Sequence, residues 1–207
     1  MADKNSAPQN RPSGRMTGPE RKQRIIEATQ EIVAQYGVQG ATTSRIAAAA
    51  GISEKTLYSH FTSRTEMLMA ALDAIFEKAR EGTFLTRQDP NVLEHLRKTS
   101  RSRRLAEGGF VYPLYEFFAA PPEAGLREEL KAQHERSLKM LQDMVEEGKS
   151  QGVIRADVDS EQTAWDIMAL YFADDVAFLL GFEVTGRTAA MAERIFRDIA
   201  ATPSATT

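Results

Sequence analysis

The chain has 207 residues, of which 42% are hydrophobic, and a formal net charge of −3. This length allows one sizeable core or a small module packed on a larger one, and the composition excludes a fibrous or wholly disordered chain. The absence of cysteine excludes disulfides, thiolate zinc sites and cysteine nucleophiles, and no metal site is expected because His60, His95 and His134 lack ligand-like spacing. No run reaches the ~20 uncharged apolar residues of a membrane span, and the amino terminus lacks a signal-peptide pattern, so we expect a cytoplasmic protein without a membrane partner.

The amino-terminal end is basic. Residues 1–60 carry eight Lys/Arg against five Asp/Glu, whereas the other 147 residues carry eighteen against twenty-four. This asymmetry favours an amino-terminal end that contacts phosphate groups and an acidic body that does not, although ordinary surface charge explains it equally well. Residues 1–16 are rich in Pro, Gly and Ser and hold hardly any large apolar side chain, so we predict a flexible basic arm.

The first helix is expected to begin at Thr17, because Thr17-Gly18-Pro19-Glu20 has the spacing of a capping box with proline in the first turn. Gly37 supplies its carboxyl-terminal stop. Its inward positions recur with a helical period, and they are Ile25, Thr29, Ile32, Val33 and Tyr36.

The next segment predicts two short helices joined by a glycine turn. Thr42 can cap a helix that ends at Ala50, and Gly51 can close it in the left-handed conformation. Ser53 can cap the second helix, from which Leu57 and Phe61 face inward. This arrangement is that of a helix-turn-helix, which places its second helix in the major groove of DNA, but similar hairpins also occur as plain structural packing.

The outward side chains of the second helix favour DNA over plain packing. They are short hydroxyls, one Lys, one Tyr and one His, which suit phosphates and base edges. Lys55 can reach guanine O6 and N7, a contact that discriminates between bases by ~1–3 kcal/mol. Thr56, Tyr58 and His60 are better suited to phosphates, as is Arg64, which follows the cap of a long helix with a second capping box at residues 63–66.

Beyond residue 81 the pattern stays helical, and no alternating run bounded by hairpin turns predicts a strand. We therefore expect an all-α fold of about nine helices, with a helix-turn-helix DNA-binding domain over residues 17–63 and a helical ligand-binding and dimerisation domain over residues 64–207. The later helices are expected over residues 91–107, 110–118, 123–151, 159–182 and 188–200.

The segment from Ala164 to Phe182 is apolar on almost all sides, so a helix there must be covered on more than one side. A partner subunit or a single-chain core could provide the second cover. Aromatic and Met side chains of the body could line an apolar effector pocket or form ordinary core. The candidate effector residues are His95, Phe110, Tyr112, Tyr115, Phe118, His134, Met144, Trp165, Met168 and Phe172.

Residues 40–61, with their continuation over residues 63–68, resemble the amino-terminal signature of TetR/AcrR-family regulators. The shared features are Thr-Thr before Ile-Ala, the Ala-Gly-Ile-Ser turn, and Thr-Leu-Tyr-x-x-Phe followed by Ser-Arg, in this order and spacing. The rest of the chain resembles the family only in its helical layout, including the Gly-Val-Ile-Arg turn at residues 152–155.

This resemblance implies a homodimer that binds double-stranded DNA at a near-palindromic operator, usually represses, and is released by a small-molecule effector, here a largely apolar or aromatic one. It assigns the dimer interface to the last two helices, about residues 159–182 and 188–200. The implied DNA contacts are Thr43, Ser44, Arg45, Ser53, Glu54, Lys55, Thr56, Tyr58, Ser59, His60 and Arg64.

Glu54 is a departure, because a carboxylate facing DNA either reads a cytosine N4 donor or repels phosphate. We favour a third interpretation, an acid at a helix start that the local dipole balances.

Other classes of function fit the sequence less well. Gly148-Lys149-Ser150 resembles the end of a phosphate-binding loop, but Asp143 stands where the first glycine is needed and the preceding segment is helical. No Gly-x-Ser-x-Gly motif is present, so we expect no enzyme and no cofactor. A helical small-molecule-binding or protein-interaction module without DNA binding would explain residues 91–207, but it leaves the hydroxyl-rich helix unexplained.

Overall fold

The computed structural model describes residues 16–81, 89–101, 111–121, 125–182 and 187–201. Within these ranges the chain is all-helical, apart from an isolated bridge between Ile154 and Ala200. The helices of the amino-terminal half are α1 (Gly18–Gly40), α2 (Thr43–Ala50), α3 (Glu54–Tyr58) and α4 (Arg64–Arg80). They are followed by α5 (Val92–Arg101), α6 (Val111–Ala119), α7 (Leu126–Ser150), α8 (Ser160–Leu179) and α9 (Arg187–Ile199). The predicted all-α fold of about nine helices is confirmed.

The predicted cap of α1 is present. The Thr17 amide donates to Glu20 Oε2 at 2.7 Å, and the Glu20 amide donates to Thr17 Oγ1 at 3.4 Å. Gly37 interrupts the helix with φ 69° and ψ 172°, and one more turn follows before Gly40. The predicted stop is therefore a kink, because only the backbone at Gly37 leaves the helical conformation.

The caps of the two short helices lie where the sequence places them. Thr42 and Ser53 accept hydrogen bonds from the amides of residues 45 and 56, and Gly51 closes α2 with φ 69° and ψ 31°. Leu57 and Phe61 are buried as predicted, but Phe61 lies beyond the end of α3. The amides of residues 59 and 60 bond to carbonyls three residues back, so the chain tightens into a turn after Tyr58.

Of the two hydrogen bonds expected for the second capping box, at residues 63–66, only one is present. Ser63 Oγ accepts from the Glu66 amide at 3.1 Å as expected, but the Glu66 carboxylate accepts from the Thr62 amide and hydroxyl, at 2.5 and 2.7 Å, instead of from the Ser63 amide. The Thr62 hydroxyl competes successfully because it adds a second donor. These two bonds hold the pKa of the Glu66 carboxyl below its ordinary value.

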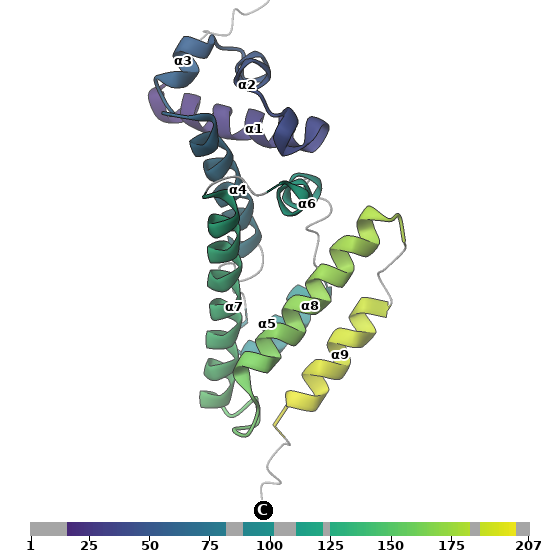
Figure 1. Ribbon diagram of the computed structural model, residues 1–207. Coiled ribbons are helices and arrows are strands. Elements are labelled where there is room, and N and C mark those ends of the chain that lie inside the picture. The colour runs from purple at the N-terminus through teal and green to yellow at the C-terminus, as the bar shows by residue number, and fades with distance from the viewer. Residues whose placement is uncertain (1–15, 82–88, 102–110, 122–124, 183–186, 202–207) are drawn as a thin grey trace, which may run out of the picture.

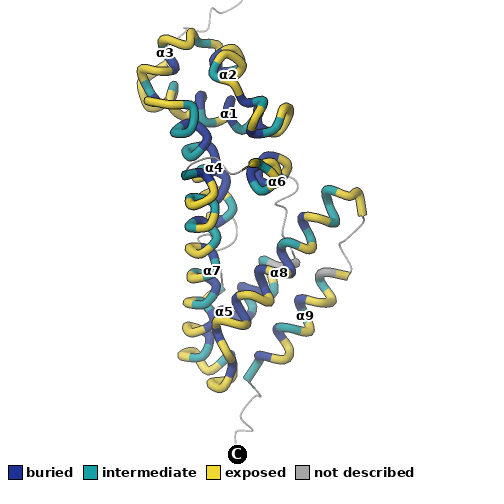
Figure 2. The backbone as a smooth tube through the Cα atoms, viewed as in Figure 1, coloured by how far each residue is buried: buried dark blue, intermediate teal, exposed yellow. Residues whose placement is uncertain are grey.

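The described helices form a helix-turn-helix end above an elongated body (Figure 1). Helices α1, α2 and α3 lie at one end, α4 runs from them into the body beside α7, and α8 and α9 run together along the other side. Buried residues follow the length of α4, whereas none of α8 beyond Asp175 is buried (Figure 2).

Two hydrophobic cores hold the fold together. The first joins α1–α3 to α4, α6 and the start of α7, and the second joins α5, α7, α8 and α9. Met67, Leu68 and Leu72 of α4 lie in the first core, so this helix packs directly under the helix-turn-helix. The predicted domain boundary between residues 63 and 64 stays a prediction. Within the described ranges, no helix is both long enough and apolar enough to cross a membrane.

Candidate nucleic-acid interface and effector cluster

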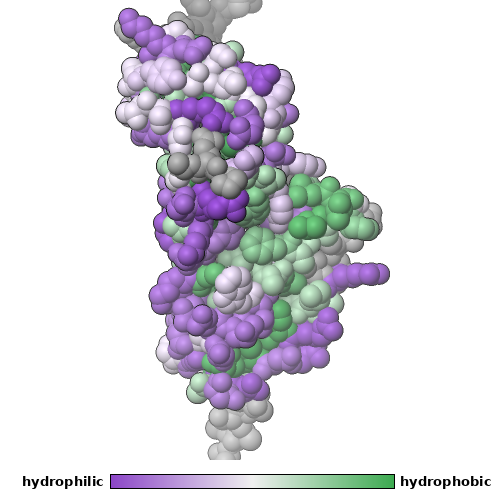
Figure 3. Space-filling model, viewed as in Figure 1, coloured by the Kyte–Doolittle hydropathy of each residue, from purple (hydrophilic) through white to green (hydrophobic). Residues whose placement is uncertain are grey.

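All eleven candidate DNA contacts lie at the helix-turn-helix end (Figure 1). They are on α2, on α3 and its cap Ser53, in the turn after α3, and at Arg64, the first residue of α4. Seven of them are exposed, and Thr43, Thr56, His60 and Arg64 are half-buried. The space-filling view shows this end as a mostly polar surface (Figure 3). A set of polar side chains therefore faces solvent at the helix-turn-helix end of the molecule.

Several of the hydroxyls also serve the local fold. Ser53 Oγ caps α3 and lies 2.9 Å from Thr56 Oγ1, and Ser59 Oγ donates to the Thr56 carbonyl at 2.6 Å. Ser44 Oγ lies 3.2 Å from the cap hydroxyl of Thr42. A hydroxyl has one proton and two lone pairs, so these groups retain only part of their capacity for a further partner.

Lys55 and Tyr58 are differently placed. Both are exposed on α3, Tyr58 by 49%, and within the described ranges neither side chain makes a hydrogen bond or an ion pair. Their polar groups extend from a helix whose other face is anchored by the buried Leu57. Both polar groups are therefore available to a partner outside the protein.

Arg45 is held in place by groups that the sequence did not indicate. Its guanidinium donates to the Gly40 carbonyl at 2.9 Å and lies 4.5 Å from the centroid of the Tyr36 ring. The prediction that Tyr36 faces inward is wrong, since this ring is 53% exposed. It stacks on Arg45 because the kink at Gly37 brings the end of α1 beside α2.

Arg64 joins α4 to the connection between α1 and α2. Its Nε donates to the Ala41 carbonyl at 2.8 Å, and its terminal nitrogen donates to the Val38 carbonyl. The guanidinium is only half-exposed. Arg64 therefore supports the orientation of α2, a role that sequence spacing did not reveal.

A second cluster lies in the body, around the His134 ring of α7. This ring has edge-on or tilted contacts with Phe76 and Phe118, at centroid distances of 4.9 and 5.1 Å, and stacks on Phe172 at 5.5 Å. Tyr115 packs edge-on against Phe118 at 5.2 Å, and its hydroxyl donates to the Phe172 carbonyl at 3.4 Å. We call these five residues, drawn from α4, α6, α7 and α8, the His134 cluster.

Burial lowers the pKa of His134, although the hydrogen bond to the Leu130 carbonyl opposes this effect. The Nδ1 atom lies 2.9 Å from that carbonyl oxygen, which can only accept, so Nδ1 carries the proton. A neutral ring with its proton on Nδ1 presents Nε2 as an acceptor. The cluster therefore offers the acceptor Nε2 among mostly apolar rings.

The structure brings together four of the ten candidate effector residues, namely Tyr115, Phe118, His134 and Phe172. Met168 is buried in the second core, Met144 and Phe172 pack against that core, and His95 is buried on α5. Met168, Met144 and His95 are not among the ring contacts that define the His134 cluster. Tyr112 and Trp165 are exposed by 51% and 52%, and Phe110 lies outside the described residues. Phe76 joins the cluster but was missed, because nothing in its sequence context separates it from ordinary core.

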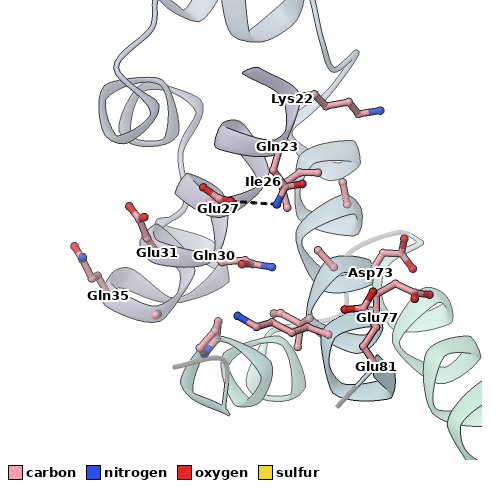
Figure 4. A pocket seen from close by; sticks show the side chains of 16 residues that line it. Lys22, Gln23, Ile26, Glu27, Gln30, Glu31, Gln35, Asp73, Glu77 and Glu81 are labelled. Atoms are coloured by element: carbon pink, nitrogen blue, oxygen red, sulfur yellow. Dashed lines mark hydrogen bonds between the residues drawn. The ribbon is translucent and has the colours of Figure 1, made fainter. Parts of the chain in front are cut away.

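An open cleft lies between α1 and α4 and has a volume of about 980 Å³ (Figure 4). Its walls include the carboxylates of Glu27, Glu31, Asp73, Glu77 and Glu81. The Gln30 amide donates to the Ala71 carbonyl at 3.0 Å and ties the two helices together. None of the candidate effector residues lines this cleft.

The outer side of α8 carries an apolar stripe. Its members are exposed and recur every three or four residues, and they are Trp165, Ala169, Ala173, Val176 and Leu180 just beyond the helix end. The opposite side of α8 packs into the second core. Figure 3 shows a hydrophobic surface at the end of α8 nearest α6, where Leu180 is 67% exposed. The sequence predicts that α8 is covered on more than one side, and within a single chain only the side that faces the second core is covered.

A helix-turn-helix that exposes Lys55 and Tyr58 on its second helix, together with a body of packed helices, defines a DNA-binding regulator. Comparison with known families agrees. Residues 25–71 match the family described as bacterial regulatory proteins, tetR family, and residues 91–193 match the tetracyclin repressor-like C-terminal domain. The chain belongs to the TetR family of transcriptional regulators, which are not enzymes.

Individual curated relatives match over only part of the chain. The HTH-type transcriptional regulator SrpR of Pseudomonas putida is 42% identical over 53 residues, which are 26% of this chain and 25% of SrpR. Matches to the curated relatives span between 25% and 40% of their length.

Solved structures match over most of the chain. Their sequence identities are low, so the similarity establishes the fold and not the function. A TetR-family regulator from a Rhodococcus species has a TM-score of 0.74 at 23% identity, covering 87% of this chain and 98% of the other. FadR from Bacillus subtilis, solved in complex with stearoyl-CoA, has a TM-score of 0.68 at 17% identity, covering 84% and 95%.

Proposed function

We propose that this TetR-family regulator is a homodimeric repressor that binds a near-palindromic operator and is released by a small, largely apolar or aromatic effector. The observation that carries the DNA-binding part is the exposure of Lys55 and Tyr58 on α3 without partners in the described ranges. Lys55 reads guanine, while Tyr58, Thr56 and His60 bind phosphate. The remaining candidate contacts complete the interface: Thr43, Ser44, Arg45, Ser53, Glu54, Ser59 and Arg64.

The apolar stripe of α8 supports the dimer. A second copy of the chain that packs its α8 and α9 against this stripe would cover Trp165, Val176 and Leu180, which are 52%, 43% and 67% exposed in one chain. Two-fold symmetry would then present two copies of α3 to successive major grooves, ~34–36 Å apart.

The His134 cluster supports an apolar or aromatic effector. Its aromatic rings offer an apolar surface, and the Nε2 acceptor of His134 can orient a donor group on the ligand. The relative solved with stearoyl-CoA indicates one chemical class to test, a thioester with a long acyl chain. His134 contacts α4 and α6, and α4 packs against the helix-turn-helix. A molecule bound at the cluster could therefore shift α4 and change the position of the helix-turn-helix.

The decisive experiment is selection of operator DNA from a random pool, followed by mobility-shift titrations at several salt concentrations. The wild type should select a two-fold symmetric sequence and lose affinity steeply as salt rises. Lys55→Ala and Tyr58→Phe should each weaken binding about five- to tenfold, whereas Lys139→Ala, an exposed lysine of α7, should not. If both α3 variants bind like the wild type with the same salt dependence, α3 is not the reading helix. If the wild type selects no sequence, the chain is a helical module without DNA binding.

Effector binding is tested by adding stearoyl-CoA, short acyl-CoA thioesters or free aromatic acids to the protein–operator complex. A true effector should release DNA and raise the melting temperature of the free protein. Phe118→Ala should weaken that response by about tenfold or more, because an aromatic contact of the His134 cluster is lost. Met144→Ala, at a residue that packs against the second core, is the control. An effector whose action is unchanged by Phe118→Ala would place the pocket elsewhere.

A further inference from the structure

One side-chain contact crosses the helix-turn-helix from one helix to the other. Thr43, in the first turn of α2, donates its hydroxyl proton to Glu54 Oε2 in the first turn of α3, at 3.0 Å. The two residues are eleven positions apart. Because α2 and α3 are independently capped, this bond is not needed to begin either helix.

The bond leaves half of the carboxylate available. Glu54 is exposed, and within the described ranges its other oxygen, Oε1, makes no hydrogen bond or ion pair. The neighbouring Lys55 does not pair with it. Glu54 therefore presents one ionised oxygen in a restricted position, since Thr43 limits the rotation of its side chain.

A helix-turn-helix contacts base edges with the first residues of its second helix. A carboxylate in that position repels phosphates and can only accept hydrogen bonds, so its favourable partners in the major groove are exocyclic amino groups. Among the contacts that side chains make with bases, Asp and Glu accept from the N4 amino group of cytosine. An Oε1 held in one orientation can accept from this amino group, whereas a freely rotating carboxylate would lose conformational entropy on forming the same hydrogen bond.

We propose that Glu54 is a specificity-determining residue that accepts a hydrogen bond from the N4 amino group of a cytosine in each operator half-site, and that Thr43 is the residue that positions it. This inference rests on the proposed binding of operator DNA through α3. It replaces the sequence-based interpretation of Glu54 as an acid that only balances the start of the helix.

The test compares operators selected by the wild type, Glu54→Gln, Glu54→Ala and Thr43→Val. The wild type should select a C·G pair at one position of each half-site, and Glu54→Gln should shift that position toward A·T, because an amide pairs with adenine N6 and N7. Glu54→Ala should lose the preference, and Thr43→Val should weaken it several-fold while Thr43→Ser restores it. Glu66→Gln is the matched control, since Glu66 also accepts from a threonine hydroxyl but lies on α4.

A second measurement uses only the wild-type protein. Each selected cytosine is replaced in turn by 2-pyrimidinone, which lacks the N4 amino group. Replacement at the position read by Glu54 should weaken binding by about tenfold, and replacement at other selected cytosines should have little effect.

The outcomes separate the two claims. If the wild type selects an operator but all variants select the same one, or if no cytosine is sensitive to loss of its amino group, Glu54 does not read a base and the inference fails while the proposed function stands. If the wild type selects no sequence, the proposed function fails and this inference with it.

Discussion

The ring of His134 stacks on the ring of Phe172, with centroids 5.5 Å apart and an interplanar angle of 26°. This contact joins α7 to α8, and the edge-on contact with Phe76 extends it to α4. One titratable side chain thus lies at the junction of the helices that connect the DNA-binding end to the body.

Acidification should destabilise the protein through His134. Burial lowers the pKa of His134 in the folded protein, so below the ordinary value of 6.5 the unfolded chain takes up a proton that the folded chain does not. The contribution of this group is therefore fully present above pH 6.5 and is lost as the pH falls toward the lower folded pKa. Between pH 7.5 and 5.5 the urea midpoint of the wild type should fall more than that of His134→Phe. Parallel curves for the two proteins would contradict the prediction.

The two glycines with positive φ beside α2 should differ in their tolerance of alanine. At Gly51 a Cβ meets nothing within 4 Å, so Gly51→Ala should cost only the left-handed strain of about 1 kcal/mol. At Gly37, φ 69° with ψ 172° lies in a region that almost only glycine adopts, so Gly37→Ala should cost about 2–3 kcal/mol from backbone strain, although the Glu116 carboxylate 2.9 Å from the new Cβ can move aside. Urea unfolding measures both, with Gly18→Ala as the neutral control. Equal costs at Gly37 and Gly51 would refute the argument.

Arg64 should act on stability as well as on DNA. Arg64→Ala removes the hydrogen bonds to the Val38 and Ala41 carbonyls and should lower the free energy of unfolding by about 1–2 kcal/mol, a value reduced by partial exposure. Arg64→Lys keeps the charge without the planar fork, so it should recover more DNA affinity than stability. Lys55→Ala, which breaks no described bond, should leave the urea midpoint unchanged. An Arg64→Ala protein as stable as the wild type would show that these bonds contribute nothing.

The apolar stripe of α8 should control the oligomeric state. Val176→Asp places a charge in the middle of the stripe and should raise the dimer dissociation constant by about tenfold or more, because an unpaired carboxylate would be buried in the interface. Sedimentation equilibrium measures this change, and Lys131→Asp on the exposed side of α7 is the control. A Val176→Asp protein that dimerises like the wild type would exclude this face.

The amino-terminal helices could be predicted well because their signals are local. Thr17, Thr42 and Ser53 each cap a helix through an amide three residues away, and Gly51 needs only its own backbone freedom. Such interactions depend on the chain within one turn, so spacing suffices to find them. The predicted boundaries of α2 and the closing turn were confirmed for this reason.

The errors in the same region arise where a competing contact decides the outcome. Tyr36 has the right period for core, but the chain turns at Gly37 and the guanidinium of Arg45 lies over its ring. Glu66 has the spacing of a capping box, but Thr62 offers it two donors in place of one. Periodicity and spacing describe positions along one helix. They do not reveal which of several possible contacts a side chain makes in the folded protein.

By itself, the sequence determined the all-α class, the helix-turn-helix and its polar outer face, because hydrophobic period, caps and turn glycines act over a few residues. Only the tertiary structure decided which aromatic side chains meet around His134, since Phe76, Phe118 and Phe172 come from three other helices. It likewise placed Met168 in the second core with Met144 packed against it, and it turned one stripe of α8 outward. Contacts between residues far apart along the chain depend on how the helices pack, and that packing is set by the shape of two whole cores.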